Sequence, residues 1–517
     1  MIAIVSNEIS GYSAGNNNRK HVKNNISKKY RKVIIMRMKY KFDLMYYVKM
    51  LFLGIIMSIS IQANAAQANA EVQKNVDLIV QGRYVVTMDP ENPVIENGAV
   101  AVKGGVIVAV GRSDDITAHY TASKTVTGKD RILLPGLING HTHTAMVMFR
   151  GMADDLAFMT WLKEYIFPME GQFVDPEFIE VGMNLACLEM IRGGTTSFVD
   201  MYFYPEKGAE VIESCGLRAI MAAPAIDFPS PGFKGWDDSH GAAVSFVKNY
   251  KSKSGRVIAG FGPHSPYTVS PEHLGQVSDA ALALDAPISI HLAEDRAELA
   301  QIKERYDSTP IVHVEGLGLF RNKVIAAHVV HLTAAEIKIL AKQKVGVIHN
   351  PTSNMKTAAG VSPVPEMLKQ GVRMGLGTDG AASNNDLNMW EEIRLAALLH
   401  KGVNYDPTVM SAPTVLRMAT IGGAEAVGLD HLVGDIVVGK RADLIQMDLT
   451  GAHMTPLYDV ISHLVYAVSG SDVVTTIVDG HILMENGKIL TLDTEKVRAK
   501  ANALAGRITQ ALKDANK

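Results

Sequence analysis

The sequence predicts an α/β protein, a (β/α)8 TIM-type barrel that carries a small β-sandwich domain built from both chain ends. Short apolar strands alternate with longer helical segments about eight times between residues 135 and 431. Runs rich in β-branched residues and punctuated by glycine occur before this region and return after it. The main alternative, a doubly wound open sheet, is disfavoured because no GxGxxG follows the first strand.

Residues 1–70 are expected to lie outside the fold, as a basic leader followed by a secretory signal peptide. The stretch 16–32 is polar and basic and shows neither a helical nor a strand period. Lysines at 39, 41 and 49 precede an apolar run over 50–61, and Ala-x-Ala sites then predict cleavage after Ala65 or Ala70. An uncleaved membrane anchor is the less favoured alternative, because the run is short for a span. We therefore expect an exported, periplasmic protein with no stable membrane association after cleavage.

The composite β domain is predicted at 71–134 and 432–493. "VDLIVQGRYVVTMD" and "GAVAVKGGVIVAVG" in the first part share their texture with "GDIVVGKRADLIQMDL" and "VVTTIVDGHILMENGKIL" in the second. The tail, 494–517, is expected to form a closing helix.

The barrel is predicted at 135–431. We expect strands at 136–143, 195–203, 218–226, 257–265, 288–295, 324–332, 345–353 and 373–380, and helices at 175–194, 270–285 and 333–343. Polar residues follow the apolar body of several strands. In a parallel barrel the C-terminal ends of the strands form the face where active sites are built.

Composition limits the choice of partners and of site chemistry. The formal net charge of −2 gives no reason to expect nucleic acid or an acidic membrane surface as a partner. Cys187 and Cys215 are too few for a cysteine-based zinc site or a disulfide scaffold. We expect two separate buried thiols, with a single bridge in an oxidising compartment as the alternative.

Four predicted strands end in side chains that can bind a metal or carry protons. His141 and His143 are two residues apart, so in a strand they point to the same side. The full set is His141, His143, His291, Glu294, His328 and Asp379. Imidazoles with one carboxylate suit a first-row divalent ion, and burying these groups together without a cation would be costly. The sequence therefore predicts a metal site at the barrel mouth.

These motifs resemble the amidohydrolase superfamily, in its branch of methylthioadenosine/S-adenosylhomocysteine deaminases and triazine chlorohydrolases. The matching stretches are "PGLINGHTHTAMVMFRGMADDLAFMTWLKEYIFPME", "GFGPHSPYTVSPE", "ISIHLAED", "AAHVVHL", "VIHNPTSNMKTAAG" and "GLGTDGAASNNDLNMWEEIRLAALLHK". The resemblance covers nearly everything after residue 75. It implies one divalent ion, zinc (Zn²⁺) with iron(II) as the alternative, bound by His141, His143, His291 and Asp379. No lysine stands in "VIAGFGPHS" to hold a second ion, and a homo-oligomer is common in this family.

The resemblance also implies catalytic roles for three residues. Asp379 would accept a proton from the water that attacks, and His328 would orient that water. Glu294 would carry protons to the ring nitrogen and to the leaving amine, which requires a carboxyl within one hydrogen bond of the substrate. In the substrate pocket, Glu170 would hold a ribose diol and His264 would bind the purine. Trp161 would wall the side that faces the 5′-substituent.

The expected reaction is hydrolytic deamination of a small-molecule nucleoside, namely methylthioadenosine, 5′-deoxyadenosine or adenosine, to the inosine form and ammonia. Two alternatives stay open at this point: hydrolysis of another aminated or chlorinated heterocycle (a purine base, pterin or triazine), and a metal-free relative without enzymatic activity. The segment "RAIMAAPAIDFPSPGFKGWDD" lacks the arginine that family members use to meet a homocysteine carboxylate. Lys234 is the nearby cation there, and a lysine does not replace a bidentate guanidinium. We therefore expect a preference for uncharged 5′-substituents.

Overall fold

The computed structural model describes residues 19–68, 73–251, 253 and 255–515. The chain divides between residues 72 and 73 into two compact units, which are described separately.

The first unit contains one long helix, α1 (Arg19–Ala68). The basic stretch 16–32, which shows no helical period, is helical from Arg19 onward. Arg31–Ile59 has the length and hydropathy of a membrane span and is exposed, properties that signal sequences near an N-terminus share. It is longer than the apolar run 50–61 that predicts the signal peptide. The predicted cleavage position Ala65 lies in α1, and Ala70 lies outside the described residues.

The second unit is built around eight parallel strands, all of which fall within the predicted segments. They are β6 (Leu137–Thr142), β7 (Thr195–Asp200), β8 (Arg218–Ala225), β9 (Val257–Pro263), β10 (Ile288–Leu292), β11 (Val324–His328), β12 (Gly346–His349) and β13 (Arg373–Leu376). They pair in chain order, and β13 lies against β6. The prediction of a (β/α)8 barrel is confirmed, and the open sheet is excluded by this closure.

The closing seam between β13 and β6 is held by both backbone and side chains. The amide of Asn139 bonds both Thr378 Oγ1, at 2.7 Å, and the Thr378 N–H, at 3.0 Å. The Asp379 N–H donates to the His141 carbonyl at 2.9 Å. A Cβ on Gly377 would stand 2.8 Å from the His141 nitrogen, so only glycine allows this approach. The seam therefore brings His141 and Asp379 together as part of the fold itself.

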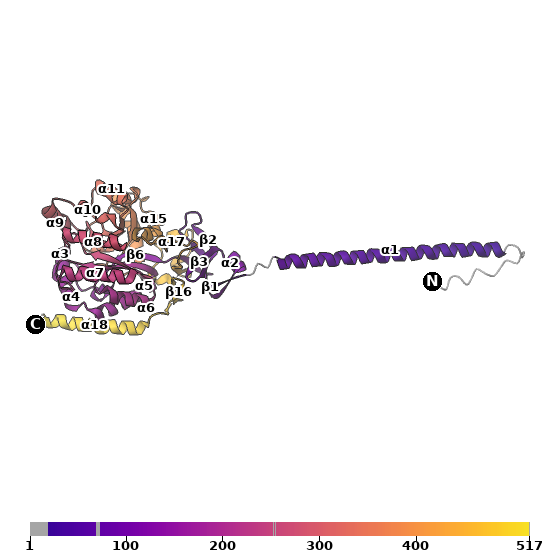
Figure 1. The fold of residues 1–517 in the computed structure, drawn as a ribbon, viewed down its shortest axis with the longest axis horizontal. Coiled ribbons are helices and arrows are strands. Elements are labelled where there is room, and N and C mark those ends of the chain that lie inside the picture. The colour runs from indigo at the N-terminus through magenta and orange to yellow at the C-terminus, as the bar shows by residue number, and fades with distance from the viewer. Residues whose placement is uncertain (1–18, 69–72, 252, 254, 516–517) are drawn as a thin grey trace. The chain divides into compact units, whose positions relative to one another are not determined.

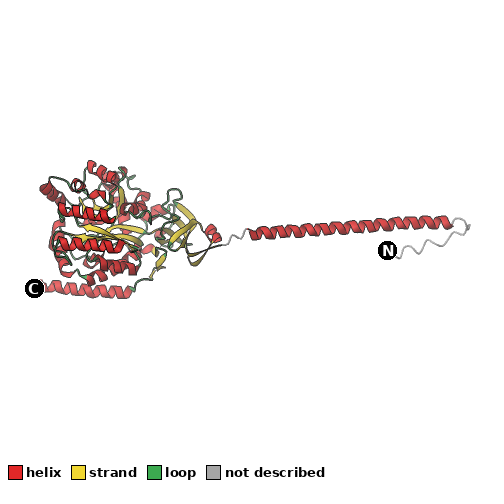
Figure 2. Cartoon of the chain, in the orientation of Figure 1, coloured by secondary structure: helices red, strands yellow, loops and turns green. Residues whose placement is uncertain are grey.

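β-branched side chains fill the lower interior of the barrel, as is typical of this fold. Ile138, Val199, Ile220, Ile325 and Ile348 form one buried cluster with the helix α16 (Ile421–Val427). Helices surround the strands (Figure 2). The longer ones are α5 (Pro176–Gly193), α6 (Pro205–Cys215), α7 (Trp236–Lys251), α8 (Pro271–Leu284), α9 (Arg296–Tyr306), α11 (Ala334–Gln343) and α14 (Met389–Asn404). The predicted helices 175–194, 270–285 and 333–343 correspond to α5, α8 and α11.

Strands from both ends of the unit form the second sheet. It has nine strands: β1 (Lys74–Val86), β2 (Val94–Lys103), β3 (Val106–Arg112), β4 (Tyr120–Val126), β5 (Arg131–Pro135), β14 (Leu444–Asp448), β15 (Val473–Val478), β16 (His481–Glu485) and β17 (Lys488–Ile489). β5 joins the two halves, because it pairs parallel with β1 and antiparallel with β14. The expected sheet from both chain ends is present as one continuous mixed sheet. Buried apolar side chains from both halves of the sheet form one cluster.

A buried ion pair connects this sheet to the barrel. Arg218, at the start of β8, donates to both carboxylate oxygens of Asp443, at 2.8 and 3.0 Å, and both side chains are almost fully buried. The last helix, α18 (Thr494–Ala515), packs along α5 (Figure 1). It begins where the closing helix was predicted.

The expectation of two separate thiols is wrong. Cys187 on α5 and Cys215 on α6 form a disulfide, with Cα atoms 6.5 Å apart, and both residues are fully buried. The two helices pack side by side, a consequence of the barrel that spacing along the chain does not reveal.

Candidate active site

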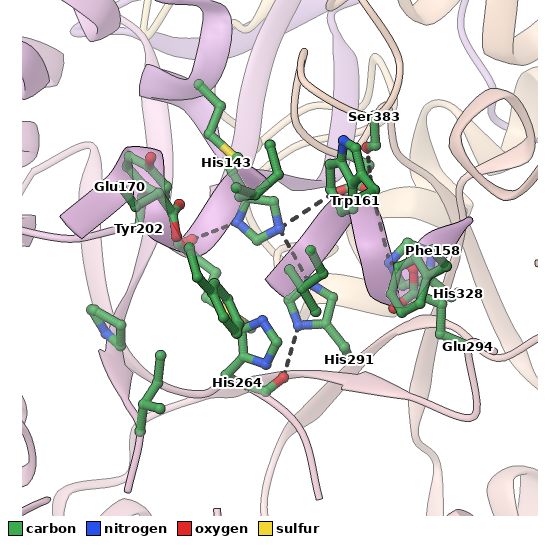
Figure 3. A pocket seen from close by; sticks show the side chains of 18 of the residues that line it. His143, Phe158, Trp161, Glu170, Tyr202, His264, His291, Glu294, His328 and Ser383 are labelled. Atoms are coloured by element: carbon green, nitrogen blue, oxygen red, sulfur yellow. Dashed lines mark hydrogen bonds and ion pairs between the residues drawn. The ribbon is translucent and has the colours of Figure 1, made fainter. Parts of the chain in front are cut away.

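A cavity of about 680 Å³ opens at the C-terminal ends of the barrel strands. Its lining contains eight of the nine predicted site residues, and the ninth, His141, lies fully buried against Asp379. Figure 3 shows His143, His291, His328 and Glu294 converging on one side of this cavity, with Glu170 on another. The structure therefore brings together residues that the sequence separates by more than two hundred positions.

The orientation of two histidines is set by backbone carbonyls. His143 Nδ1 lies 2.6 Å from the Met201 carbonyl oxygen, and His291 Nδ1 lies 2.7 Å from that of His264. Since a carbonyl only accepts, each Nδ1 must carry the proton, and each neutral ring then presents an Nε2 lone pair to the cavity. The two Nε2 atoms are 3.1 Å apart. Two lone pairs at this distance repel unless a cation or a shared proton lies between them.

Asp379, three residues after the end of β13, uses its two oxygens differently. Oδ2 accepts hydrogen bonds from Ser353 and Ser383, each at 2.7 Å. Oδ1 accepts the Gly380 N–H and lies 3.4 Å from His141 Nε2 and 3.3 Å from His143 Nε2. Oδ1 is therefore the oxygen that faces the imidazoles.

The spacing of these donor atoms fits a single small ion. Nitrogen and oxygen ligands about 2.0 to 2.1 Å from a tetrahedral zinc lie roughly 3.3 Å from one another. The separations of 3.1, 3.3 and 3.4 Å among the nearest donors match that value. Neither ring nitrogen of the fully buried His141 has a hydrogen-bond partner among the described residues, so the fold leaves it free to bind an ion.

A fifth donor, His328, stands somewhat apart. His141, His291, His328 and Asp379 have ligand atoms within 4.8 Å of one another, a set that contains His328 and three of the predicted ligands but not His143. The Nε2 of His328, however, faces Asp379 Oδ2 at 3.9 Å and Glu294 Oε1 at 3.7 Å, whereas His141 and His143 face Oδ1 and His291 lies against His143. His328 Nδ1 lies 2.8 Å from Asn354 Oδ1, which fixes the ring. Its Nε2 therefore points to the space between Glu294 and the remaining donors.

The electrostatics favour one added positive charge at this point. Burial lowers the pKa of His141 to about 4 and holds that of His291 well below its ordinary value. Burial also acts on His143, but the adjacent Asp379 carboxylate outweighs it and raises the pKa of His143 to about 9. Although burial opposes ionisation of Asp379, its contacts with His141 and His143 keep its pKa well below the usual range. The raised pKa of His143 means that the cluster tends to bind a proton, whose positive charge offsets that of the Asp379 carboxylate. A divalent cation bound at the same place would offset that negative charge in the same way.

Glu294 is also buried, and its pKa is shifted upward, whereas that of Asp379 is lowered. Burial, together with the nearby Asp379 and Asp295 carboxylates, raises its pKa well above the ordinary value. A carboxyl whose pKa is raised keeps its proton to a higher pH, which suits it to act as a general acid.

The three predicted substrate residues lie around the same cavity. Glu170 is 6% exposed on α4 (Phe167–Phe173), and burial raises its pKa to about 7. His264 follows β9; burial lowers its pKa to about 3, so its ring is neutral, and its Nδ1 contacts Ser265 and Thr268. Trp161, stacked on Phe158 with ring centroids 6.0 Å apart, completes an apolar wall.

Several supporting residues were missed by the sequence analysis. Ser353, Ser383 and Asn354 hold Asp379 and His328 through the bonds given above. The buried carboxylate of Glu298 accepts the N–H groups of Ala293 and Glu294. The quoted motifs contain Ser353, Asn354 and Ser383, but a motif alone does not show which side chain each one bonds.

Four residues at the site have a left-handed backbone conformation. Ala293, His328, Val329 and Asp379 have φ values of 52°, 71°, 46° and 63°, a region that non-glycine residues rarely adopt. The β-branched Val329 is the most unfavourable case. Such strain persists where the surrounding structure imposes it, as at strand ends that re-aim side chains into an active site.

A closed eight-stranded barrel with imidazoles and a carboxylate gathered at its C-terminal mouth is the architecture of a barrel hydrolase. The chain matches the amidohydrolase family over residues 132–483 and belongs to that family. The predicted family is thus confirmed, and with it the expectation of a hydrolytic enzyme.

Three similar proteins illustrate the match. A 5-methylthioadenosine/S-adenosylhomocysteine deaminase of Syntrophobacter fumaroxidans is 42% identical over 84% of this chain and 98% of its own length. A 5′-deoxyadenosine deaminase of Methanosarcina barkeri is 44% identical over 83% of this chain and 98% of its own. The crystal structure of a zinc-bound adenosine deaminase from Xanthomonas campestris superposes with a TM-score of 0.83, at 38% identity, covering 85% of this chain and all of that one.

Proposed function

We propose that this protein is a zinc-dependent deaminase of adenosine-type nucleosides that carry an uncharged 5′-position. One observation carries the proposal: a single cavity combines the His/Asp cluster, a buried Glu294 whose pKa is raised, and a buried Glu170 within an apolar wall. The names of the similar deaminases support the reaction class.

His141, His143, His291 and Asp379 would hold the ion. They are preferred over a set that contains His328 because His141 and His143 face Asp379 Oδ1 and His291 Nε2 lies 3.1 Å from His143 Nε2, whereas His328 faces Oδ2 and Glu294. Three nitrogens and one oxygen suit zinc, and iron(II) accepts the same donors. When bound, the ion lowers the pKa of water and so makes a strong nucleophile available near neutral pH.

The side chains around that point can then guide the protons. Water oxygen forms a bond to C6 of the purine, the C6–N6 bond breaks, and ammonia leaves. Asp379 accepts the proton of the attacking water, and His328 Nε2, held by Asn354, orients that water. Glu294 gives its proton to the ring nitrogen as C6 is attacked. It then takes the proton of the new C6 hydroxyl and passes it to the amino group, which leaves as ammonia. Transfer of the water proton from Asp379 to Glu294 restores both carboxyl groups.

Substrate recognition would come from three directions. An ionised Glu170 accepts hydrogen bonds from both hydroxyls of a ribose diol. The neutral His264 can donate to a purine nitrogen, and Trp161 with Phe158 covers the apolar edge of the nucleoside.

The residues that line the cavity support a preference for substrates with uncharged 5′-substituents. None of the described residues that line the catalytic cavity is a lysine or arginine. An adjoining cavity of about 770 Å³ shares Phe167, Glu170, Phe203 and Ile226 with it and is otherwise bounded mainly by uncharged residues of 228–232. Lys234 is exposed and belongs to neither lining. A homocysteine carboxylate would therefore lose its hydration without gaining a cationic partner.

Ammonia release from a panel of compounds tests the proposal. The panel contains adenosine, 5′-deoxyadenosine, methylthioadenosine, S-adenosylhomocysteine, guanine, a pterin and an aminated or chlorinated triazine. We expect the highest kcat/KM among the first three. Turnover of a base, pterin or triazine alone would support the alternative hydrolase, and a purified protein without stoichiometric metal or turnover would support the non-enzymatic relative.

We also propose export to the periplasm, supported by two independent features. The exposed apolar segment of α1 is followed by the predicted Ala-x-Ala sites, and the Cys187–Cys215 disulfide is typical of oxidising compartments. N-terminal sequencing of protein recovered from cell fractions tests both export and cleavage. A homo-oligomer is proposed from the family resemblance and is tested by light scattering.

A further inference from the structure

We propose that Glu298 is a positioning residue that aims the Glu294 carboxyl by holding the backbone of the preceding turn. Oε1 of Glu298 accepts the Ala293 N–H at 3.0 Å, and Oε2 accepts the Glu294 N–H at 2.8 Å. This inference rests on the proposed function, because it assigns Glu298 a role through the proton carrier of that reaction.

Two successive N–H groups normally point in different directions along a chain. Here they converge because Ala293 adopts a left-handed conformation with φ of 52°. Successive amides turned in this way form a small concave site for an anion. In this protein the Glu298 carboxyl group fills that site, and its two hydrogen bonds offset the cost of the unusual alanine conformation. Burial raises the pKa of Glu298 to about 8, and these two hydrogen bonds act against that rise.

The same short segment is held from its other side by the loop after β11. The N–H of Val329 donates to the Leu292 carbonyl at 3.1 Å, and the N–H groups of Val330 and His331 donate to the Ala293 carbonyl at 2.9 and 3.0 Å. The carbonyls are therefore tied to the loop that carries His328, and the amides are tied to Glu298. This arrangement sets the direction in which Glu294 leaves the backbone and its 3.7 Å separation from His328.

Glu298 has no direct route to a substrate. It is fully buried in the first turn of α9, where Asp295 caps the helix, and it does not line the catalytic cavity. Both of its carboxylate oxygens are engaged with backbone amides. Its influence on the reaction must therefore pass through Glu294.

The test is Glu298→Gln, whose amide nitrogen cannot accept one of the two N–H groups. We expect kcat to fall at least tenfold for the best nucleoside of the panel, while KM and the zinc content of the purified protein change less than twofold. Glu298→Asp, too short to reach both amides, should give an intermediate kcat and serves as the second variant if the glutamine protein folds poorly.

Glu336→Gln is the matched control. Glu336 is also a buried glutamate in the first turn of the helix after a barrel strand, and it accepts the Thr333 N–H at 2.6 Å. It does not line the catalytic cavity. Its replacement should lower stability comparably but leave kcat within twofold of wild type. An equal loss of kcat in both variants would assign Glu298 a merely structural role and overturn the proposal.

A double-mutant cycle tests whether Glu298 acts on the reaction through Glu294. In a Glu294→Gln background, adding Glu298→Gln should not reduce the residual kcat further, because the group being positioned is already absent. Independent, multiplicative losses would contradict the proposal.

Should the wild-type protein deaminate no nucleoside, the proposed function fails, and amide hydrogen exchange still decides the inference. The amides of Ala293 and Glu294 should exchange faster in Glu298→Gln than in wild type or in Glu336→Gln, and unchanged exchange would overturn it.

Discussion

Replacing Glu170 by glutamine is expected to weaken turnover of ribose-containing substrates while making the folded protein more stable. A carboxylate accepts from both hydroxyls of a diol, whereas the glutamine side chain has one accepting oxygen. The loss of one charge-assisted hydrogen bond costs about 1.5 to 3 kcal/mol. This corresponds to a decrease of about 10- to 150-fold in kcat/KM.

Stability should change in the opposite direction at alkaline pH. Burial raises the pKa of Glu170 from 4.5 to about 7. Below pH 4.5 the carboxyl is protonated in the folded and the unfolded chain, so wild type and variant have similar stability. Between pH 4.5 and 7 the unfolded chain ionises first, so wild type loses stability relative to the variant. Above pH 7 the difference is constant, at up to about 3 kcal/mol in favour of glutamine.

The assay compares kcat/KM for adenosine and 2′,3′-dideoxyadenosine, together with urea unfolding at pH 4 and pH 8. The variant should lose activity on adenosine and little on the dideoxy compound. Glu164→Gln, an exposed glutamate six residues earlier, is the control and should change neither quantity. An equal loss on both substrates, or a less stable variant at pH 8, would refute the reasoning.

Three other predictions concern the ion, the domain contact and specificity. Chelation should remove one equivalent of metal and lower the unfolding temperature, because an ion at 1,000 times its Kd stabilises the folded protein by about 4 kcal/mol. Elemental analysis measures the metal and calorimetry measures the unfolding temperature. An unchanged unfolding temperature would argue against a buried ion at His141. Arg218→Met leaves the Asp443 carboxylate buried without its ion-pair partner and should cost about 3 to 5 kcal/mol in urea unfolding. The Arg218→Met/Asp443→Leu double variant should recover most of that loss. S-Adenosylhomocysteine should show a KM at least tenfold above that of methylthioadenosine, and equal kcat/KM values would contradict the proposed lining.

The local pattern of apolar and polar residues was sufficient to predict the barrel. Each predicted strand contains an observed one, because a buried parallel strand is a short apolar run whose end is marked by glycine, proline or a polar residue. The helices α5, α8 and α11 follow from amphipathic spacing and from capping residues such as Asp175, Ser270 and Thr333. These signals are carried by residues adjacent in the chain, so no tertiary information is needed to find them.

Pairings between distant segments could not be predicted in this way. The Cys187–Cys215 disulfide depends on two helices packing side by side. Two free thiols were expected because free cysteines usually behave as small buried hydrophobic residues. The hydroxyls of Ser353 and Ser383 meet on one oxygen of Asp379 because the loops after β12 and β13 converge. Nothing in either motif distinguishes these serines from ordinary loop residues.

The sequence by itself determined which donor atoms are available: imidazoles and carboxylates at the ends of particular strands. Tertiary structure decided their distances and charge states. Barrel closure joins Asn139 to Thr378 across 239 positions of sequence and thereby sets His141 against Asp379. Burial then raises the pKa of Glu170 to about 7 and that of Glu294 well above its ordinary value. The reason is physical: residue type sets the chemistry a group can perform, whereas the coulombic and desolvation energies that select its protonation state depend on distance and solvent access, which exist only in the folded chain.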